Sequence, residues 1–292
     1  MTSRDVQIGP RNRRRRAFCY VVLMKPRVIW LLVLASVAGY LYAGGRSPVS
    51  LAELVAVGTL SAGGAAAFNH YWERREDSVM SRTRARPIPA GCVEPRRALE
   101  FSLATTAVGI ALALLWLGAP AAASVALGWF SYAVAYTVIL KKRSIANIFV
   151  GGLAGVAAFI TGCLSAGLLD ASALLLSAAI YLWIPSHIWS LAYVYRQDYA
   201  RAGIKMLPVV LDDRKASAVI SALNIFSAAY MAATLLLVSP IAAAVQAAAS
   251  AYGVYISARS LAGGDPGYFW RMFKASGPLL TVYLALIAAA RL

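Results

Sequence analysis

Long apolar stretches, separated by short polar connections, run along almost the whole chain. Each is close to the roughly 20 residues that a helix needs to cross the roughly 30 Å hydrocarbon layer of a bilayer. None alternates apolar and polar residues at every second position, as a strand of a membrane barrel does. We therefore expect an all-α, polytopic membrane bundle of nine transmembrane helices. The expected spans are 28–45, 50–71, 98–117, 119–139, 147–168, 171–195, 216–238, 240–257 and 274–290.

The basic residues fall mainly on one side of these spans. The chain is 60% hydrophobic and 14% charged, which excludes an ordinary soluble domain, and its formal net charge is +16. With the N-terminus inside, 26 of the 28 lysines and arginines lie on the cytoplasmic side, and only Arg46 and Arg291 lie outside. Orientation by positive charge and attraction to membrane lipid explain this excess, so we expect no nucleic-acid partner. The chain is expected in the cell membrane, with a cytoplasmic N-terminus, an extracytoplasmic C-terminus and its functional loops on the cytoplasmic face.

The chain is expected to hold one domain, residues 28–292, behind a basic cytoplasmic segment, residues 1–27. The apolar run after RNRRRR is interpreted as a retained span and not as a signal peptide, because eight further spans follow it. Cys19, Cys92 and Cys163 have neither metal-binding spacing nor an even count. We therefore expect no disulfide and no zinc site, and interpret the cysteines as packing residues.

The first long cytoplasmic loop carries acids at helical spacing. In NHYWERRED, Asn69, Glu73 and Asp77 recur at every fourth residue and would line one face of a helix leaving the membrane. Mg²⁺ is a hard ion that binds oxygen ligands, often one or two carboxylates together with substrate phosphates. These three residues are therefore candidate magnesium ligands and catalytic residues.

Arginines follow these acids in MSRTRARPIPAG. Arg82, Arg84 and Arg86 are candidate diphosphate-binding residues, because guanidinium groups bind phosphate oxygens bidentately. The alternative is that these acids and arginines pair with one another at the membrane surface, without a ligand.

The second long loop adds a further acid and further cations. In the run that ends YVYRQDYARAGIK, Asp198 would complete the metal site, and Arg196 and Lys205 would bind phosphate. His187 and Tyr195 share a helix face with Asp198, which places His187 deeper in the cavity. A third basic segment, KKR, adds Lys142 and Arg143 beside Lys141 as diphosphate contacts, the alternative being an ordinary positive-inside cluster.

Four segments together resemble the UbiA superfamily of intramembrane prenyltransferases over residues 23 to 215. They are LMKPRVIWLLVLASVAG, NHYWERREDSVMSRTRARPIPAG, YTVILKKRSIANIFVGGLAG and LWIPSHIWSLAYVYRQDYARAGIKMLPVV. The last is the most specific, and it is similar to the branch of the family that farnesylates heme. The quinone and lipid branches typically carry a second DxxxD there, where this chain has Ala202. Glu73 also departs from the family pattern, which commonly has aspartate at that position.

The resemblance implies a nine-helix bundle around a central cavity. Two cytoplasmic loop motifs would cap this cavity, with Mg²⁺ bound between them. It implies transfer of the farnesyl group of farnesyl diphosphate to the vinyl group of heme B, giving heme O. Trp183, His187 and Tyr195 are the candidate heme-binding residues. The alternatives are transfer of a polyprenyl chain to an aromatic or lipid acceptor, and a transporter or assembly factor without chemistry. A transporter would place its ionisable residues at the bilayer midplane, whereas these acids are expected at one edge.

Overall fold

The computed structural model describes residues 10–261, 263 and 265–290, and the regular structure in that part of the chain is entirely helical. The elements are α1 (Pro10–Leu23), α2 (Pro26–Tyr42), α3 (Pro48–Trp72), α4 (Arg74–Val79), α5 (Pro95–Leu112) continued by η1 (Ala113–Leu117), α6 (Ala119–Trp129) continued by η2 (Phe130–Leu140), α7 (Asn147–Ser165), α8 (Ala171–Val194), α9 (Arg196–Arg201), α10 (Leu207–Val210), α11 (Asp213–Thr234) continued by η3 (Leu235–Leu237), α12 (Pro240–Ser260) and α13 (Pro266–Ala289).

These helices confirm the expected all-α membrane bundle. Within the described residues, eight helices are long and apolar enough to cross a membrane, and the bent pair formed by α1 and α2 gives a ninth. The two helices of that pair meet at 49°. Two boundaries differ most from the expectation: α13 starts at Pro266 and not at 274, and α1 extends the first span backward into the basic segment. Residues 1–9 of that segment lie outside the described part of the chain.

Helices α2 and α7 touch backbone to backbone. A Cβ on Gly162 would lie 1.9 Å from the Ser36 carbonyl oxygen, and a Cβ on Gly39 would lie 2.1 Å from the Phe159 carbonyl oxygen. Small residues let membrane helices approach this closely where no hydrophobic effect drives them together. This seam fixes α2 against α7 on one side of the cavity described below.

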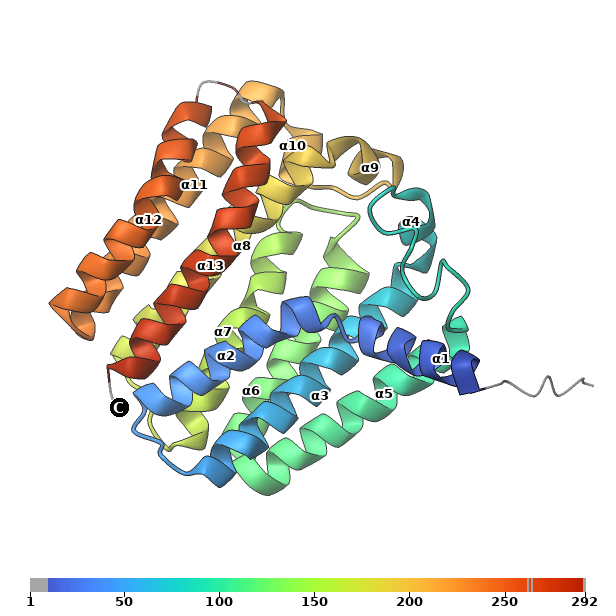
Figure 1. Ribbon diagram of the computed structural model, residues 1–292, viewed down its shortest axis with the longest axis horizontal. Helices are drawn as coiled ribbons and strands as arrows, with labels where there is room; N and C mark the ends of the chain where they lie inside the picture. The colour runs from blue at the N-terminus through green and yellow to red at the C-terminus, as the bar shows by residue number, and fades with distance from the viewer. Residues whose placement is uncertain (1–9, 262, 264, 291–292) are drawn as a thin grey trace, which may run out of the picture.

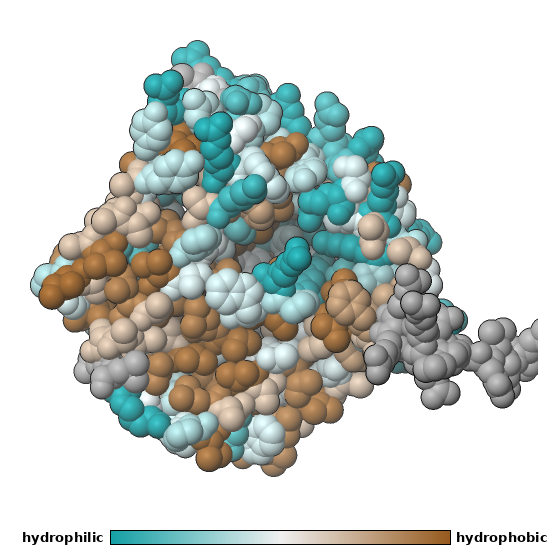
Figure 2. Space-filling model, viewed as in Figure 1, coloured by the Kyte–Doolittle hydropathy of each residue, from teal (hydrophilic) through white to brown (hydrophobic). Residues whose placement is uncertain are grey.

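The polar connections gather at one end of the bundle. Helices α4, α9 and α10 lie together at that end, opposite the C-terminus (Figure 1). Hydrophilic side chains cover the same end, whereas hydrophobic ones cover most of the remainder of this face, which is hollowed near its middle (Figure 2). An apolar body with one polar cap is the surface expected of a protein embedded in lipid.

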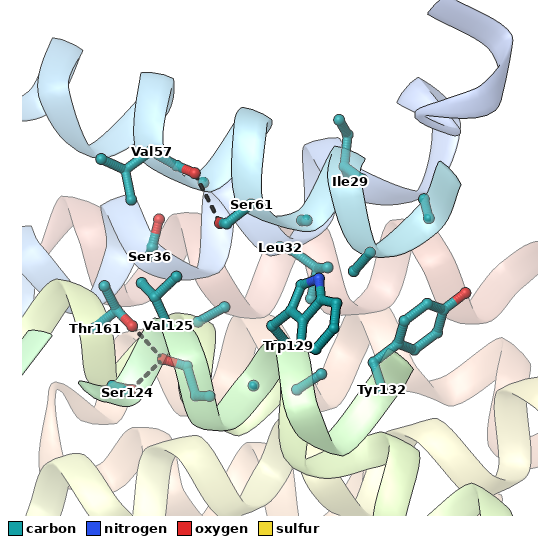
Figure 3. Close-up of a pocket in the computed structure, with 18 of the residues that line it drawn as sticks. Ile29, Leu32, Ser36, Val57, Ser61, Ser124, Val125, Trp129, Tyr132 and Thr161 are labelled. Atoms are coloured by element: carbon teal, nitrogen blue, oxygen red, sulfur yellow. Dashed lines mark hydrogen bonds between the residues drawn. The ribbon is translucent and has the colours of Figure 1, made fainter. Parts of the chain in front are cut away.

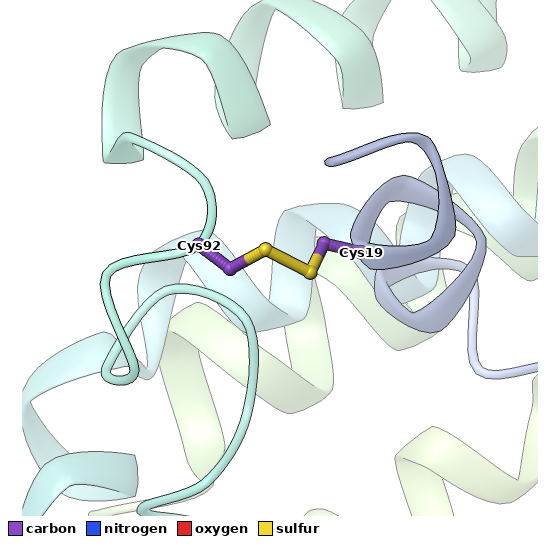
Figure 4. Close-up of a disulfide and its surroundings, with 2 residues drawn as sticks. All are labelled: Cys19 and Cys92. Atoms are coloured by element: carbon purple, nitrogen blue, oxygen red, sulfur yellow. A yellow bond between two sulfur atoms is a disulfide. The ribbon is translucent and has the colours of Figure 1, made fainter. Parts of the chain in front are cut away.

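A disulfide overturns the expectation that the cysteines are unpaired packing residues. Cys19 on α1 is bonded to Cys92 in the loop after α4, across 73 residues of sequence (Figure 4). Beneath it, Leu23 packs with Ile88 and Val93 in a buried apolar cluster. Only Cys163 is free among the described cysteines, and it is buried. An odd count hid this pair, because one unpaired cysteine says nothing about the other two.

Candidate active site

Asn69 is held at the membrane end of the polar cap. It lies on the last turn of α3 and is 1% exposed. Its Oδ1 accepts a hydrogen bond from Lys25 Nζ at 2.5 Å, and its Nδ2 donates to Thr137 Oγ1 at 3.1 Å. The amide is therefore oriented by side chains from two other parts of the chain, so its oxygen has a fixed direction.

Glu73 and Asp77 follow Asn69 along a nearly continuous helical path. Helix α3 ends at Trp72 and α4 begins at Arg74, yet Glu73 N donates to Asn69 O at 2.9 Å and Asp77 N donates to Glu73 O at 2.8 Å. The fourth-residue spacing thus survives the break between the helices. Both acids are buried, Glu73 at 6% exposure and Asp77 at 1%.

Each buried acid faces a cation. Glu73 forms an ion pair with Lys141, and Asp77 accepts two hydrogen bonds from Arg86 Nη1 at 2.7 and 2.8 Å. Burial opposes ionisation of Glu73, but the ammonium groups of Lys141 and Lys25 outweigh it and hold its pKa below the ordinary value. Burial likewise opposes the charge on Arg86, and Asp77 reverses this and raises its pKa. The neighbouring cations therefore favour the charged form of Glu73 despite its burial.

The second long loop meets the first at Asp198. This residue of α9 is 3% exposed, and its Oδ2 accepts hydrogen bonds from Ser81 Oγ at 2.6 Å and from Arg82 N at 3.3 Å. Its Oδ1 accepts from Arg201. Burial raises the pKa of this carboxyl, but the hydrogen bonds from Ser81 and Arg201 outweigh it and leave the pKa below its usual range. Two segments about 120 residues apart in sequence thus converge at one carboxylate.

The connection between η2 and α7, residues 141–146, contacts the second long loop. Lys205 N donates to Lys141 O at 3.3 Å, and Asn147 Nδ2 donates to Lys205 O at 2.9 Å. Lys141 therefore links the acid of the first loop to the backbone of the second. The three connections form one interlocked polar cap.

The predicted metal ligands do not form one cluster in this arrangement. No group of three or more His, Cys, Asp or Glu side chains is placed to hold a metal among residues 10–261, 263 and 265–290. Asp198 contacts Ser81 and Arg82, whereas Glu73 and Asp77 contact Lys141 and Arg86. The alternative of acids and cations pairing with one another therefore describes the contacts that are present.

The donor set nevertheless fits magnesium. Asn69, Glu73 and Asp77 supply only oxygen, the ligand type that Mg²⁺ prefers, and they follow one another on one helical path. Three cations, Lys25, Arg86 and Lys141, act on the two carboxylates. A metal ion with a diphosphate would replace these pairs, with the carboxylates binding the metal and the cations binding phosphate oxygens.

The predicted diphosphate-binding residues divide into inner and outer ones. In the described part of the chain, Arg86 is the one whose side chain contacts a predicted metal ligand. Arg82 Nη2 donates to Tyr199 OH at 3.3 Å, and Lys142 pairs with Glu76. Arg196 Nη1 donates to Asp213 at 2.8 Å, which turns this side chain toward α11. The remaining three, Arg84, Arg143 and Lys205, are exposed, as are Arg82, Lys142 and Arg196.

Two cations of this site were missed or misplaced by sequence reasoning. Lys25 has φ 53° and ψ 58°, the left-handed region that residues other than glycine rarely adopt. Lys141 is buried, whereas the predicted Lys142 is exposed. The sequence pattern that indicates Lys25 is a lysine before a proline inside an apolar run. A charged residue there interrupts a membrane span and is costly unless it serves a site. Nothing in KKR distinguishes its first lysine from its second.

An apolar cavity begins beneath the charged residues. It encloses about 770 Å³ of empty space including its open mouth, and it is bounded by α2, α3, α6 with η2, and α7. Lys25, which donates to Tyr132 OH at 3.3 Å, lines the end of the cavity next to the charged residues. Val57 and Ser124 lie on the side of the cavity opposite Tyr132 (Figure 3). Lys25 belongs to both the charged site and the cavity, so the two are continuous.

The predicted acceptor residues lie elsewhere, between α8 and α13. The His187 ring stacks between Trp183 and Phe273, with ring centroids 4.3 and 4.6 Å away. Its Nδ1 lies 2.6 Å from Ser276 Oγ, and the Trp183 indole donates to the Ser276 carbonyl at 2.9 Å. Tyr195 lies nearer the cap, where the Arg82 guanidinium stands 5.8 Å from its ring.

Ser276 orients the His187 ring. Its hydroxyl oxygen lies 2.6 Å from His187 Nδ1 and 2.8 Å from the Phe273 carbonyl oxygen, and the tautomer of the ring decides which partner donates. The tautomer with its hydrogen on Nδ1 donates to Ser276, leaves that hydroxyl free to donate to Phe273, and carries the lone pair on Nε2. A histidine oriented in this way can act as a ligand through Nε2.

A helical membrane bundle with a charged site above an apolar cavity can hold a molecule with a polar head on an apolar chain. The model of the UbiA prenyltransferase family matches residues 28–286, and the chain belongs to this family. It is therefore a membrane prenyltransferase.

Its relatives include proteins named protoheme IX farnesyltransferase. That of Pyrobaculum arsenaticum is 54% identical over 276 residues, which cover 93% of this chain and 99% of the relative. That of Caldivirga maquilingensis is 44% identical and covers 94% and 99%, and that of Metallosphaera sedula is 36% identical and covers 95% and 97%.

Solved structures share the fold. A digeranylgeranylglyceryl phosphate synthase superposes with a TM-score of 0.75 at 15% identity, covering 94% of this chain and 98% of the other. A UbiA homologue from Archaeoglobus fulgidus, bound to GPP and Mg²⁺, has a TM-score of 0.68 at 15% identity and covers 92% and 99%. At this identity the likeness establishes the architecture alone.

Proposed function

We propose that this protein catalyses the magnesium-dependent transfer of a farnesyl group from farnesyl diphosphate to the vinyl group of heme B, giving heme O. The observation that carries the proposal is the position of a buried cluster of cations and acids at the mouth of an apolar cavity. A prenyl diphosphate has a charged head and an apolar tail in the same order. The name shared by relatives up to 54% identical supports farnesyl as the chain and heme as the acceptor.

The head would be held at Asn69, Glu73 and Asp77, with Asp198 closing the site from the second loop. A magnesium ion bound there would neutralise the charge that develops on the leaving diphosphate. The bond between C1 of the farnesyl chain and the diphosphate oxygen breaks, and the electron pair leaves with the diphosphate.

Three cations are already present for that leaving group. Lys25, Lys141 and Arg86 each contact an oxygen of Asn69, Glu73 or Asp77 and would exchange it for a phosphate oxygen. Because their positions are fixed before binding, little reorganisation is needed as charge develops. The exchange also keeps the buried acids compensated throughout, so no carboxylate is left alone in the bundle.

The acceptor would bind against α8 and α13. His187 offers Nε2 as a ligand for heme iron, and its ring is fixed by Trp183 and Phe273 on its two faces. The heme vinyl group attacks C1 of the farnesyl chain with its π electrons. Water then adds to the resulting cation and loses a proton, which gives the hydroxyethylfarnesyl side chain.

The site is proposed to face the cytoplasm, with the N-terminus on that side and the C-terminus outside. The cations of the cap support this orientation, because lysine and arginine are retained on the cytoplasmic side of membrane proteins. The proposed domain, residues 28–292, then starts just after the bend at Lys25.

The purified protein tests this proposal directly. It should convert heme B and farnesyl diphosphate into heme O when Mg²⁺ is present, with one diphosphate released for each product, as measured by mass analysis of the porphyrin. Removal of the metal with EDTA should abolish both products, and added Mg²⁺ should restore them. Release of diphosphate without a prenylated porphyrin would contradict the proposal that heme B is the acceptor. Activity that EDTA leaves unchanged would contradict the proposed requirement for Mg²⁺.

A further inference from the structure

We propose that Val57 is the residue that stops the prenyl chain, so that the cavity admits three isoprene units and excludes four. The inference rests on the proposed function, because it assigns the cavity to the tail of the diphosphate substrate. It adds Val57 on α3 as a position that determines chain-length specificity. It also assigns a role to the small residues between Val57 and the charged site, which leave that part of the cavity open.

The depth of the cavity can be estimated from residue positions along helix α3. The helix runs from Asn69 at the charged mouth past Ala62 and Gly58 to Val57, and the last three of these line the cavity. At about 1.5 Å per residue, Ala62 lies about 10 Å below Asn69 and Val57 lies about 18 Å below it. Tyr132 and Val57 lie on opposite sides of the cavity, in agreement with this order (Figure 3).

The lengths of prenyl chains can be compared with this depth. Carbon bonds of about 1.5 Å that meet near 111° advance about 1.25 Å each. The extended main chain of a geranyl group then reaches about 9 Å, that of a farnesyl group about 14 Å and that of a geranylgeranyl group about 19 Å. Between Asn69 and Val57 the farnesyl chain fits, and the geranylgeranyl chain meets the Val57 side chain.

The end of the cavity is closed by packing. Val57 is 1% exposed and packs with Ala113 and Ala122, which are buried at the far end of η1 and α6. Leu54, one turn further along α3, is also 1% exposed and lines the same end. The end wall therefore consists of two branched side chains backed by small ones, and truncation of Val57 would open space toward Ala113.

The hydroxyl groups near that end do not make it polar. Ser61 Oγ donates to the Val57 carbonyl at 2.7 Å, and Ser36 Oγ donates to the Val33 carbonyl at 3.0 Å. Ser124 Oγ donates to the Ala157 carbonyl at 3.0 Å. Because these hydrogens are already used, the hydroxyls need no partner from a ligand and tolerate an alkyl chain beside them.

Small residues between Val57 and the charged site leave room for the third isoprene unit. A Cβ at Gly58 would meet nothing closer than 3.4 Å, and Ala62 lines the cavity about 10 Å below Asn69. A leucine at position 62 would therefore enter the cavity and leave room for about a geranyl chain. Ala107 on α5 is exposed, so leucine there adds the same atoms outside the cavity.

The experiment compares wild type, Ala62→Leu, Val57→Ala and the control Ala107→Leu with geranyl, farnesyl and geranylgeranyl diphosphates. Turnover with heme B is measured as kcat/KM for each chain length, and binding is measured without acceptor by displacement of labelled farnesyl thiodiphosphate. We expect Ala62→Leu to shift the preference from farnesyl to geranyl by at least about tenfold. We expect Val57→Ala to raise geranylgeranyl relative to farnesyl by a similar factor. Ala107→Leu should match wild type.

The two assays separate this inference from the proposed function. Shifted binding preferences without heme prenylation would support the length stop and overturn the acceptor. Heme prenylation with unshifted preferences in both cavity variants would overturn the length stop. If one cavity variant fails to fold, as judged by its thermal unfolding, the other decides, because the two changes act in opposite directions.

Discussion

At the scale of single residues, the site stores strain and buried charge where a polar head would bind. Lys25 adopts a left-handed backbone conformation, which costs of order 1–3 kcal/mol for a residue other than glycine. The conformation brings its ammonium within 2.5 Å of Asn69 Oδ1 and to the mouth of the cavity. A left-handed lysine before Pro26 therefore places one cation where the charged and apolar parts of a substrate would join.

Asp77→Asn should lower turnover by at least about 100-fold, because a metal-binding carboxylate contributes several kcal/mol to stabilising the leaving group. Helical content should persist, since the amide still accepts a hydrogen bond from Arg86. Turnover of farnesyl diphosphate and circular dichroism measure the two effects. Glu53→Gln is the matched change, because Glu53 lies on α3 near the end that is far from this site, and it should retain activity. Full activity of Asp77→Asn would exclude this residue as a ligand.

His187→Phe should weaken heme binding by at least about tenfold and remove the absorption signature of a histidine-ligated heme. Farnesyl thiodiphosphate binding should be unchanged, because His187 does not line the prenyl cavity. Ser276→Ala should have a smaller effect of the same kind, since it releases Nδ1 without removing Nε2. An unchanged heme spectrum in His187→Phe would show that another group binds the iron.

At the scale of elements, the cap is assembled by contacts between connections and not by any one of them. Asp198 joins α9 to the loop after α4, and Asn147 joins the start of α7 to Lys205. The disulfide adds α1 to the same cap by way of Cys92. A substitution that alters the structure of one of these connections is therefore expected to alter the structure of the others.

Loss of the disulfide should destabilise the cap. Cross-linking residues 73 positions apart removes conformational entropy from the unfolded chain, and such bonds typically contribute about 2–4 kcal/mol. Thermal unfolding of the Cys19→Ser/Cys92→Ser variant should therefore occur at a lower temperature than that of wild type. A reductant should lower the wild-type transition and leave the variant unchanged. If the reductant lowers the unfolding temperature of both proteins equally, its effect does not come from the Cys19–Cys92 disulfide.

The elements could be predicted from the sequence, whereas their contacts could not. Hydropathy located the spans because a bilayer imposes both their length and their composition. The spacing of Asn69, Glu73 and Asp77 predicted their shared helical path, because it depends on local geometry alone. The partners of Asp198 and His187 lie about 90 to 120 residues away and follow from how the helices pack, which no local pattern encodes.

At the scale of the whole molecule, the bundle separates a charged end from an apolar interior. The polar cap covers one end of the membrane helices (Figures 1 and 2). The cavity continues from it between α2, α3, α6 and α7. A reactive prenyl chain held in that interior is kept from water until its acceptor arrives. The same division explains why the acids are buried at one edge and not at the middle of the bundle.

The most direct test of this account is an experimental structure of the protein with farnesyl thiodiphosphate and Mn²⁺, in which the anomalous signal locates the metal. We expect the ion bound to carboxylate oxygen of Asp77 within about 2.2 Å, the diphosphate in contact with Lys25 and Arg86, and the chain ending at Val57. A metal at another place, or a prenyl chain outside the cavity, would contradict the account.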